Sequence, residues 1–384
     1  MRSLGGATFF VFGIVLVLLG ANQAELARSL ELDLARSGFL GAILALGLGA
    51  GVLIAGPLAD RFPHRPLFIG SCLLAAAGLG SVDDGRGYVG VVLLLLIAGL
   101  GCGIYDTVVN AAVVRQNPER SASALALVHS LATLGAGIGP LLIRYWLSHG
   151  HWARTFHALA VLHVVLALWG LFSPAWSRHG AVPDVQRVAA DMAWPALIAL
   201  SIVAFAYVGV ENGITVFAVP WAQSRGESEA VGQWSISSLW SGLFIGRLGL
   251  VLRPPRRGLS LLAVAGLGGA AIVCATSMFE LGPLVLATGF AGVVLGPVYP
   301  LMIALVAQRF PERSGTALGL VAGAGAAGGF AVPWLIGVLG DAWGVRPALT
   351  LLGASALFVS AAALGLSRRD AAALEPAADG GSGS

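Results

Sequence analysis

Apolar stretches of about twenty residues, separated by short polar segments, recur along nearly the whole chain. A helix needs roughly 20 apolar residues to cross the hydrocarbon core of a bilayer. Twelve such stretches can be placed, near 7–27, 37–60, 65–82, 88–114, 121–147, 154–173, 193–223, 231–251, 258–278, 281–308, 314–340 and 347–366. The pattern predicts an all-α membrane protein with twelve transmembrane helices.

The second half of the chain repeats part of the first. Residues 118–143 match residues 311–336 at a constant offset of 193, with 12 identities in 26 positions. Two related halves built from apolar helices are typical of secondary transporters. We therefore expect two pseudo-symmetric six-helix bundles. Their ranges are 1–173 and 193–367, with a cytoplasmic linker at 174–192 and a tail at 368–384 that ends in a Gly/Ser linker.

The composition supports a membrane protein and argues against a soluble domain. Hydrophobic residues make up 57% of the chain, charged residues 11%, and the mean hydropathy is +0.86, whereas soluble domains carry about 25% charged residues. The three cysteines lie far apart and show no metal-site spacing. We expect no enzymatic activity, no metal, no organic cofactor and no nucleic-acid partner. The expected partners are the bilayer and a small-molecule substrate, with the chain acting as a monomer.

The arginines predict the orientation. With both termini in the cytoplasm, fourteen arginines fall in inner loops and tails and six in outer loops, as the positive-inside rule requires. All 22 basic residues are arginine, which indicates a GC-rich genome. We expect a multi-pass protein of the bacterial cytoplasmic (inner) membrane.

The loop after the second stretch carries a recognisable motif. Residues 56–65 read Gly-Pro-Leu-Ala-Asp-Arg-Phe-Pro-His-Arg and resemble the G-x-L-x-D-R-x-x-x-R cytoplasmic loop of the major facilitator superfamily. The resemblance implies a gating loop in which Asp60 caps a helix of the other half while Arg61 and Arg65 bridge the cytoplasmic gap. The residues of the predicted gating loop are Gly56, Asp60, Arg61 and Arg65. The second half carries a degenerate copy of the motif, Gly242-x-x-x-Gly246-Arg247, which adds Arg247 to this group.

Ionisable residues inside apolar stretches are the candidates for coupling. A buried acid costs at least ~2.5 kcal/mol, so it usually faces a cavity and has a function. Asp106 and Glu211 lie well inside their stretches, and Glu25 lies toward the outer end of the first. Each has a structural alternative: a helix–helix hydrogen bond for Asp106 or Glu211, and contact with lipid headgroups for Glu25.

The repeat singles out three polar residues of the first half. Asp106, Asn110 and His129 align with Tyr299, Ile303 and Ala322, so these polar groups are not shared by the two halves. Such asymmetry is expected where one half has specialised in coupling or recognition. Asp106 and His129 fall at similar depths on consecutive helices, and we predict that they interact and exchange protons. An interhelical structural role for His129 is the alternative.

A narrower resemblance suggests the substrate. Asp106-Thr107-x-x-Asn110, the segment from His129 to Leu141, and Tyr207-Val208-Gly209-Val210-Glu211 resemble elements of the fucose permease and sodium–glucose transporter-like branch. In that branch the acids of helices 1 and 4 serve proton coupling and sugar binding, which implies such roles for Glu25 and Asp106. Asp106 replaces the glutamate usual in that branch, and no proline follows it.

A sugar site needs hydrogen-bonding side chains around aromatic surfaces. The substrate-binding candidates are Asn22, Tyr105, Asn110, Asn212, Gln233, Trp234, Trp240 and Tyr299. For Trp234, anchoring at the membrane interface is the alternative.

These observations predict proton-coupled symport of a small polar, sugar-like solute by alternating access. Sodium is an alternative coupling ion because Asp106, Thr107 and Asn110 offer oxygen ligands. The main alternative function is a proton-coupled efflux antiporter for drugs, lipids or other amphipathic compounds, because residues 135–140 also resemble the helix 5 motif of drug exporters. A non-transporting receptor would need neither the loop motif nor the intramembrane acids.

Overall fold

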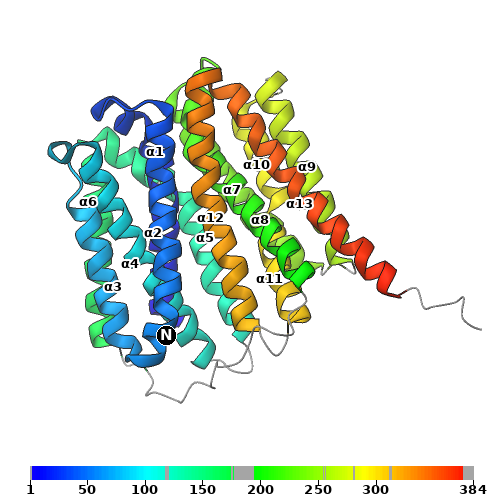
Figure 1. The fold of residues 1–384 in the computed structure, drawn as a ribbon. Helices are drawn as coiled ribbons and strands as arrows, with labels where there is room; N and C mark the ends of the chain where they lie inside the picture. The colour runs from blue at the N-terminus through cyan, green and yellow to red at the C-terminus, as the bar shows by residue number, and fades with distance from the viewer. Residues whose placement is uncertain are drawn as a thin grey trace, which may run out of the picture.

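The chain folds into a bundle of long helices that lie roughly side by side (Figure 1). The computed structural model describes residues 2–116, 121–173, 176, 194–253, 255, 257–279, 282–310 and 314–374. Its helices are α1 (Arg2–Ser29), α2 (Leu34–Arg61), α3 (His64–Gly80), the 3-10 turn η1 (Asp84–Arg86), α4 (Gly87–Gln116), α5 (Ser121–Ser148), α6 (Ala153–Phe172), α7 (Trp194–Ser224), α8 (Glu229–Leu252), α9 (Gly258–Phe279), α10 (Leu284–Leu295), α11 (Val298–Arg309), α12 (Ser314–Trp343) and α13 (Val345–Leu374). The predicted all-α class is confirmed.

The thirteen α-helices form twelve spans among the described residues, because α10 and α11 are two parts of one span. The sequence predicts a continuous tenth helix, but the structure breaks it at Gly296 and Pro297. Proline has no backbone N–H and its ring clashes with the preceding turn, so it interrupts a helix. Within the described ranges, ten spans are long and apolar enough to cross a membrane. Helix α3, with 17 residues, and α8 are not among those ten.

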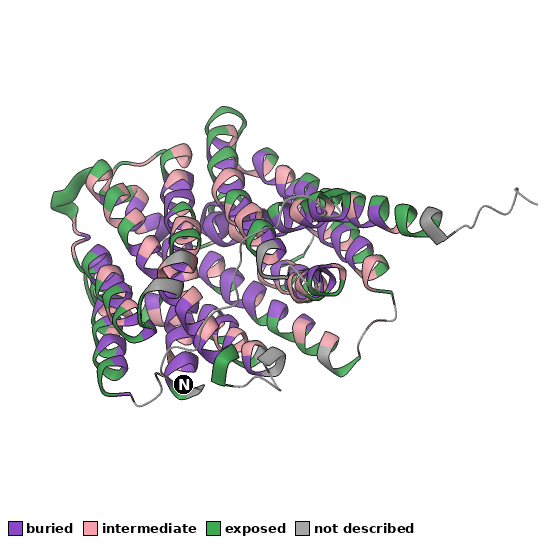
Figure 2. Ribbon diagram, turned by 60° about the horizontal axis from the view of Figure 1, so that its bottom comes forward, coloured by how far each residue is buried: buried purple, intermediate pink, exposed green. Residues whose placement is uncertain are grey.

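Apolar side chains cover the periphery of the bundle as well as its interior. Figure 2 shows buried residues where helices face one another and exposed residues along the outward faces. Among the exposed residues are large apolar side chains such as Phe172 (79% exposed) and Val89 (68%). A soluble protein rarely leaves so many apolar side chains in water, so these outward faces are suited to lipid.

Helices α1–α6 form the amino-terminal half and α7–α13 the carboxyl-terminal half. Within the first half α1 packs on α5, α2 on α4, and α3 on α4 and α6; within the second, α7 packs on α12 and α13, α8 on α10, and α9 on α13. The halves meet mainly along α2 with α12, α5 with α8, and α1 with α7, with smaller contacts of α1 with α8 and α2 with α7.

The interface between the halves is tight toward the outer ends of the helices and open toward the inner ends. A Cβ atom placed on Gly20 would lie 1.9 Å from the carbonyl oxygen of Thr215 in the other half. At Gly56, Gly319 and Gly323, near the inner ends of α2 and α12, it would meet no described residue of another helix within 4 Å. In the orientation that the arginines predict, this is an inward-facing state.

Candidate functional site

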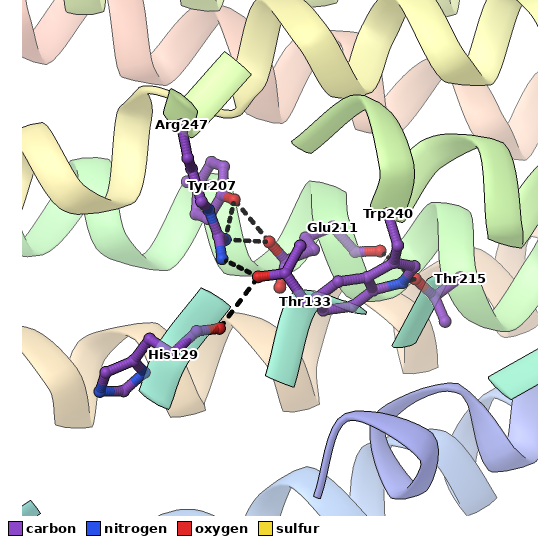
Figure 3. Close-up of polar contacts among 7 residues, drawn as sticks. All are labelled: His129, Thr133, Tyr207, Glu211, Thr215, Trp240 and Arg247. Carbon is purple, nitrogen blue, oxygen red and sulfur yellow. Dashed lines mark hydrogen bonds and ion pairs between the residues drawn. The ribbon is translucent and has the colours of Figure 1, made fainter. Parts of the chain in front are cut away.

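Arg247 lies at the centre of a polar network that joins the two halves (Figure 3). From α8 its guanidinium donates a hydrogen bond from Nη1 to Thr133 Oγ1 (2.6 Å) on α5 and from Nη2 to Tyr207 Oη (3.3 Å) on α7. Nη2 also lies 3.6 Å from Glu211 Oε2. An arginine side chain inside a membrane protein needs a charged or polar partner. Arg247 finds partners on both sides of the interface.

Tyr207 and Glu211 lie on one face of α7 because they are four residues apart in a helix. The Tyr207 hydroxyl donates a hydrogen bond to Glu211 Oε2 at 2.5 Å. The side chains of Glu211 and Arg247 are 13% and 22% exposed. At 3.6 Å and an effective dielectric constant of 20, their attraction is roughly 4–5 kcal/mol. The pair brings opposite charges together inside the network.

The amino-terminal half contributes Thr133 and His129, one turn apart on α5. The Thr133 hydroxyl accepts from Arg247 and donates to the backbone oxygen of His129 at 3.1 Å. The His129 ring packs edge-on against Phe9 of α1, with ring centroids 4.7 Å apart. Thr133 is thus the direct contact between α5 and Arg247, while His129 supports it through its backbone.

Asp106 lies on α4 without a cationic contact among the described residues. Its Oδ1 accepts a hydrogen bond from Asn110 Nδ2 at 3.3 Å, and the Oδ1 of Asn110 is buried without a partner. Both side chains are only partly exposed. The pair therefore retains unused hydrogen-bonding capacity near the interface.

Tyr299 is the second residue of α11, the helix that follows the break at Pro297. Its ring centroid lies 6.1 Å from that of Tyr207, and its phenol is within electrostatic range of Asp106, Glu211 and Arg247. The helix after the break thus places the Tyr299 ring beside Tyr207, next to the ion pair of the second half.

Several other predicted site residues stabilise the contacts between helices. The Asn22 amide is buried, donates to Leu18 O at 2.8 Å and accepts from Thr155 at 3.1 Å. Gln233 donates to Ala21 O across the interface at 3.0 Å.

Two further candidates lie on the interior faces of α7 and α8. The Trp240 indole donates to Thr215 Oγ1 at 3.2 Å and is 2% exposed. Asn212 faces α12, where its amide nitrogen lies 2.5 Å from the position of a Cβ on Gly329.

Two predicted placements need correction. Tyr105 is fully buried inside the amino-terminal half, where its hydroxyl contacts Cys102 Sγ (3.2 Å) and His163 Nε2 (3.3 Å). It precedes Asp106 by one residue, and a step of about 100° around the helix turns it toward α6. Asp106 contacts Asn110 while His129 contacts Phe9, so the predicted interaction between Asp106 and His129 is not found in this state.

Arg247 does not act as part of a cytoplasmic loop. It lies inside α8, and its side chain extends toward Glu211. A long side chain on a helix points back toward the helix N-terminus, which for α8 is the outer end. Arg247 thus lies within the predicted stretch 231–251, and its partners are Glu211, Tyr207 and Thr133.

The remaining predicted residues lie toward the two membrane surfaces. Glu25 pairs with Arg28 at 3.2 Å and is 37% exposed, at the outer end of α1. Trp234 is 48% exposed at the start of α8, as an interfacial anchor would be. Gly56 and Arg65 lie at the inner end of α2 and the start of α3, with Arg65 exposed. The side chains of Asp60 and Arg61 lie outside the part of the chain that the structure describes.

Two residues of the network were missed from the sequence as site residues. Thr133 sits in an apolar stretch where its hydroxyl has no distinctive spacing, and Tyr207 was noted only as part of a motif. The signal for Tyr207 was its position four residues before Glu211. For Thr133 no signal in the sequence identifies the partner, because Arg247 is 114 residues away.

Comparison with known proteins agrees with this architecture. Residues 4–279 match the Major Facilitator Superfamily. The uncharacterized MFS-type transporter YfkL of Bacillus subtilis (strain 168) is 25% identical over 360 residues, which cover 88% of each chain. Sodium-dependent glucose transporter 1A of Mus musculus is 25% identical over 406 residues, covering 92% of this chain and 93% of that protein.

A solved structure shows the same fold. A bacterial homolog to the human lysosomal transporter Spinster, in an inward-facing and occupied conformation, matches with a TM-score of 0.77 and 14% identity over 96% of each chain. The superfamily resemblance of the loop at 56–65 is confirmed, as is distant homology to the sodium-dependent glucose transporters. The chain belongs to the Major Facilitator Superfamily and is a multi-pass integral membrane protein, a secondary transporter and not an enzyme.

Proposed function

We propose that this transporter is a proton-coupled symporter of a small polar solute, with Glu211 as the coupling acid. The observation that carries the proposal is the position of Arg247. Its guanidinium is shared between Glu211 of its own half and Thr133 of the opposite half. A change of charge at Glu211 therefore acts on a contact between the halves.

The net charge of the Glu211–Arg247 pair links the binding of the proton to the binding of the solute. When Glu211 is ionised, it neutralises Arg247. When Glu211 binds a proton, Arg247 keeps its charge, because the guanidinium is not deprotonated in proteins, and the charge is left without a counter-ion in a region of low dielectric constant. An uncompensated buried charge is strongly destabilising. A solute rich in oxygen atoms would supply the missing acceptors, so proton and solute stabilise each other's binding.

The solute would lie between the two halves. Asp106 and Asn110 offer acceptors and donors from the first half, and Tyr299 offers an aromatic face near the ion pair. Pyranose rings combine apolar faces with polar rims, which such a set of groups can bind. Similarity to the mouse glucose transporter supports a sugar-like solute.

The transport cycle follows from the architecture. Residues 1–173 and 193–367 would move as two bundles around the central site, with 174–192 as the linker. The match to a Bacillus relative over 88% of each chain supports placing the protein in a bacterial cytoplasmic membrane.

The experiment is a solute-driven pH change in proteoliposomes. A panel of monosaccharides is added to purified protein in sodium-free buffer, and the internal pH is followed with a trapped dye. We expect proton uptake with at least one sugar and no stimulation when sodium is added. Uptake that requires sodium would assign the coupling to a different ion. Proton release driven by amphipathic cations would overturn symport in favour of efflux.

A further inference from the structure

The outer ends of α2 and α12 are joined by an acid that caps the partner helix. Asp341, near the end of α12, accepts hydrogen bonds from the backbone N–H groups of Leu34 (2.9 Å) and Ala35 (2.8 Å), the first two residues of α2. The residues are more than 300 positions apart in the chain. A negative charge at a helix N-terminus is stabilised by both the free N–H groups and the helix dipole.

Helix α2 uses two acids for its first turn. Asp33 Oδ1 accepts from Arg36 N at 2.7 Å, and the Asp33 carbonyl accepts from Ser37 N at 3.0 Å. The first four N–H groups of a helix have no partner within the helix. Of these groups, the Arg36 N–H is satisfied by the Asp33 carboxylate of the same half and the N–H groups of Leu34 and Ala35 by Asp341 of the other half, while the bond from Ser37 is the first regular bond of the helix.

Close packing of the α2 and α12 backbones brings Asp341 within hydrogen-bonding distance of the start of α2. A Cβ atom on Gly337, one turn before Asp341, would lie 2.4 Å from Leu34 O. Two further links cross the outer interface nearby. Arg28 pairs with Glu229 at 2.5 Å, and Gln233 donates to Ala21 O.

The same two helices separate at their inner ends. Among the described residues, no atom outside the local helix lies within 4 Å of a Cβ placed on Gly56 of α2 or on Gly319 and Gly323 of α12. Opening the transporter to the outside must therefore break the contact between Asp341 and α2. We infer that Asp341 is a positioning residue for transport: its cap on α2 is the latch that holds the outer gate closed.

The chain offers a matched control for this role. Asp33→Ala removes a carboxylate cap from the same helix end but leaves the link between the halves intact. Asp341→Ala removes a cap of the same kind together with the link. A purely structural role in stabilising α2 would give the two variants the same phenotype.

The test measures the distance between outer ends by double electron–electron resonance. Spin labels at His149 and Gln223, both exposed, report on the α5–α6 and α7–α8 ends in a variant without the three native cysteines. Charge-assisted hydrogen bonds are roughly twice as strong as neutral ones, so losing both bonds to Asp341 shifts the balance between the two states measurably. We expect the long-distance population to rise about tenfold in Asp341→Ala and to stay unchanged in Asp33→Ala.

A milder variant, Asp341→Asn, keeps the test decisive if Asp341→Ala does not fold. Asp341→Asn keeps one acceptor oxygen and loses the charge, so a smaller rise in the same population is expected. Distance distributions equal to the parent protein in both Asp341 variants would overturn the latch. An equal shift in Asp33→Ala would also overturn it, because the effect would then come from α2 itself.

Discussion

Arg247 of α8 donates a 2.6 Å hydrogen bond to the hydroxyl of Thr133 on α5, across the interface between the two halves. The same guanidinium lies 3.6 Å from Glu211 in its own half. One side chain therefore links the ionisation of an acid to a contact that forms only when α5 and α8 are close together. This relationship is the basis of the predictions that follow.

Thr133→Val should weaken the inward-facing state. Valine keeps the shape of threonine but cannot accept from Arg247, and a hydrogen bond to a charged group contributes about 1.5–3 kcal/mol. We expect a cysteine introduced at Gly319, which faces open space in this state, to be labelled from the inner side at least several-fold more slowly.

The control for that prediction is Thr276→Val. The Thr276 hydroxyl donates to Ile272 O within its own helix, so its loss should leave the labelling rate unchanged. Equal labelling in the parent and in Thr133→Val would show that the Arg247–Thr133 bond does not influence the equilibrium between states.

Gly20→Ala should disturb closure of the outer interface. The added Cβ would lie 1.9 Å from Thr215 O in the other half, so the backbones must move apart. Overpacking of this kind costs about 1–3 kcal/mol. We expect a lower melting temperature in detergent and separation of the outer ends. Gly319→Ala, which would meet no described neighbour within 4 Å, should melt like the parent protein. A parent-like melting temperature for Gly20→Ala would contradict the close approach of Gly20 to Thr215.

Most of the fold could be predicted from the sequence because a bilayer imposes a simple rule. Each span must be apolar and about twenty residues long. The sequence offers twelve such stretches, and ten described helical spans meet the rule in both length and apolar character. The break at Pro297 was missed because hydropathy continues smoothly across it, although the Gly296-Pro297 pair was a local signal.

The site was harder to predict because it depends on how each helix is rotated about its axis. Helix α4 is apolar on every side, so periodicity did not distinguish Asp106, near the interface, from Tyr105, in the core. Arg247 was assigned to the loop motif because its partners, Glu211 and Thr133, become neighbours only after three helices have packed. No single stretch of sequence contains that information.

Asp106→Asn should weaken solute binding without removing coupling. The asparagine can still contact Asn110, but it offers one acceptor oxygen fewer to a solute. We expect a KM for the transported sugar about tenfold higher and an unchanged ratio of protons to solute, measured by parallel uptake of labelled sugar and pH change. If Asp106→Asn instead takes up no protons with the sugar while its KM stays normal, Asp106 is the coupling acid.

The most direct measurement of the central claim compares coupled transport with exchange in Glu211→Gln. Glutamine can still accept from Tyr207 but cannot bind and release a proton. In sodium-free proteoliposomes we predict that solute-driven proton uptake disappears, while exchange of labelled for unlabelled solute across the membrane continues. Proton uptake by Glu211→Gln at the rate of the parent protein would contradict the claim that Glu211 couples the proton to transport.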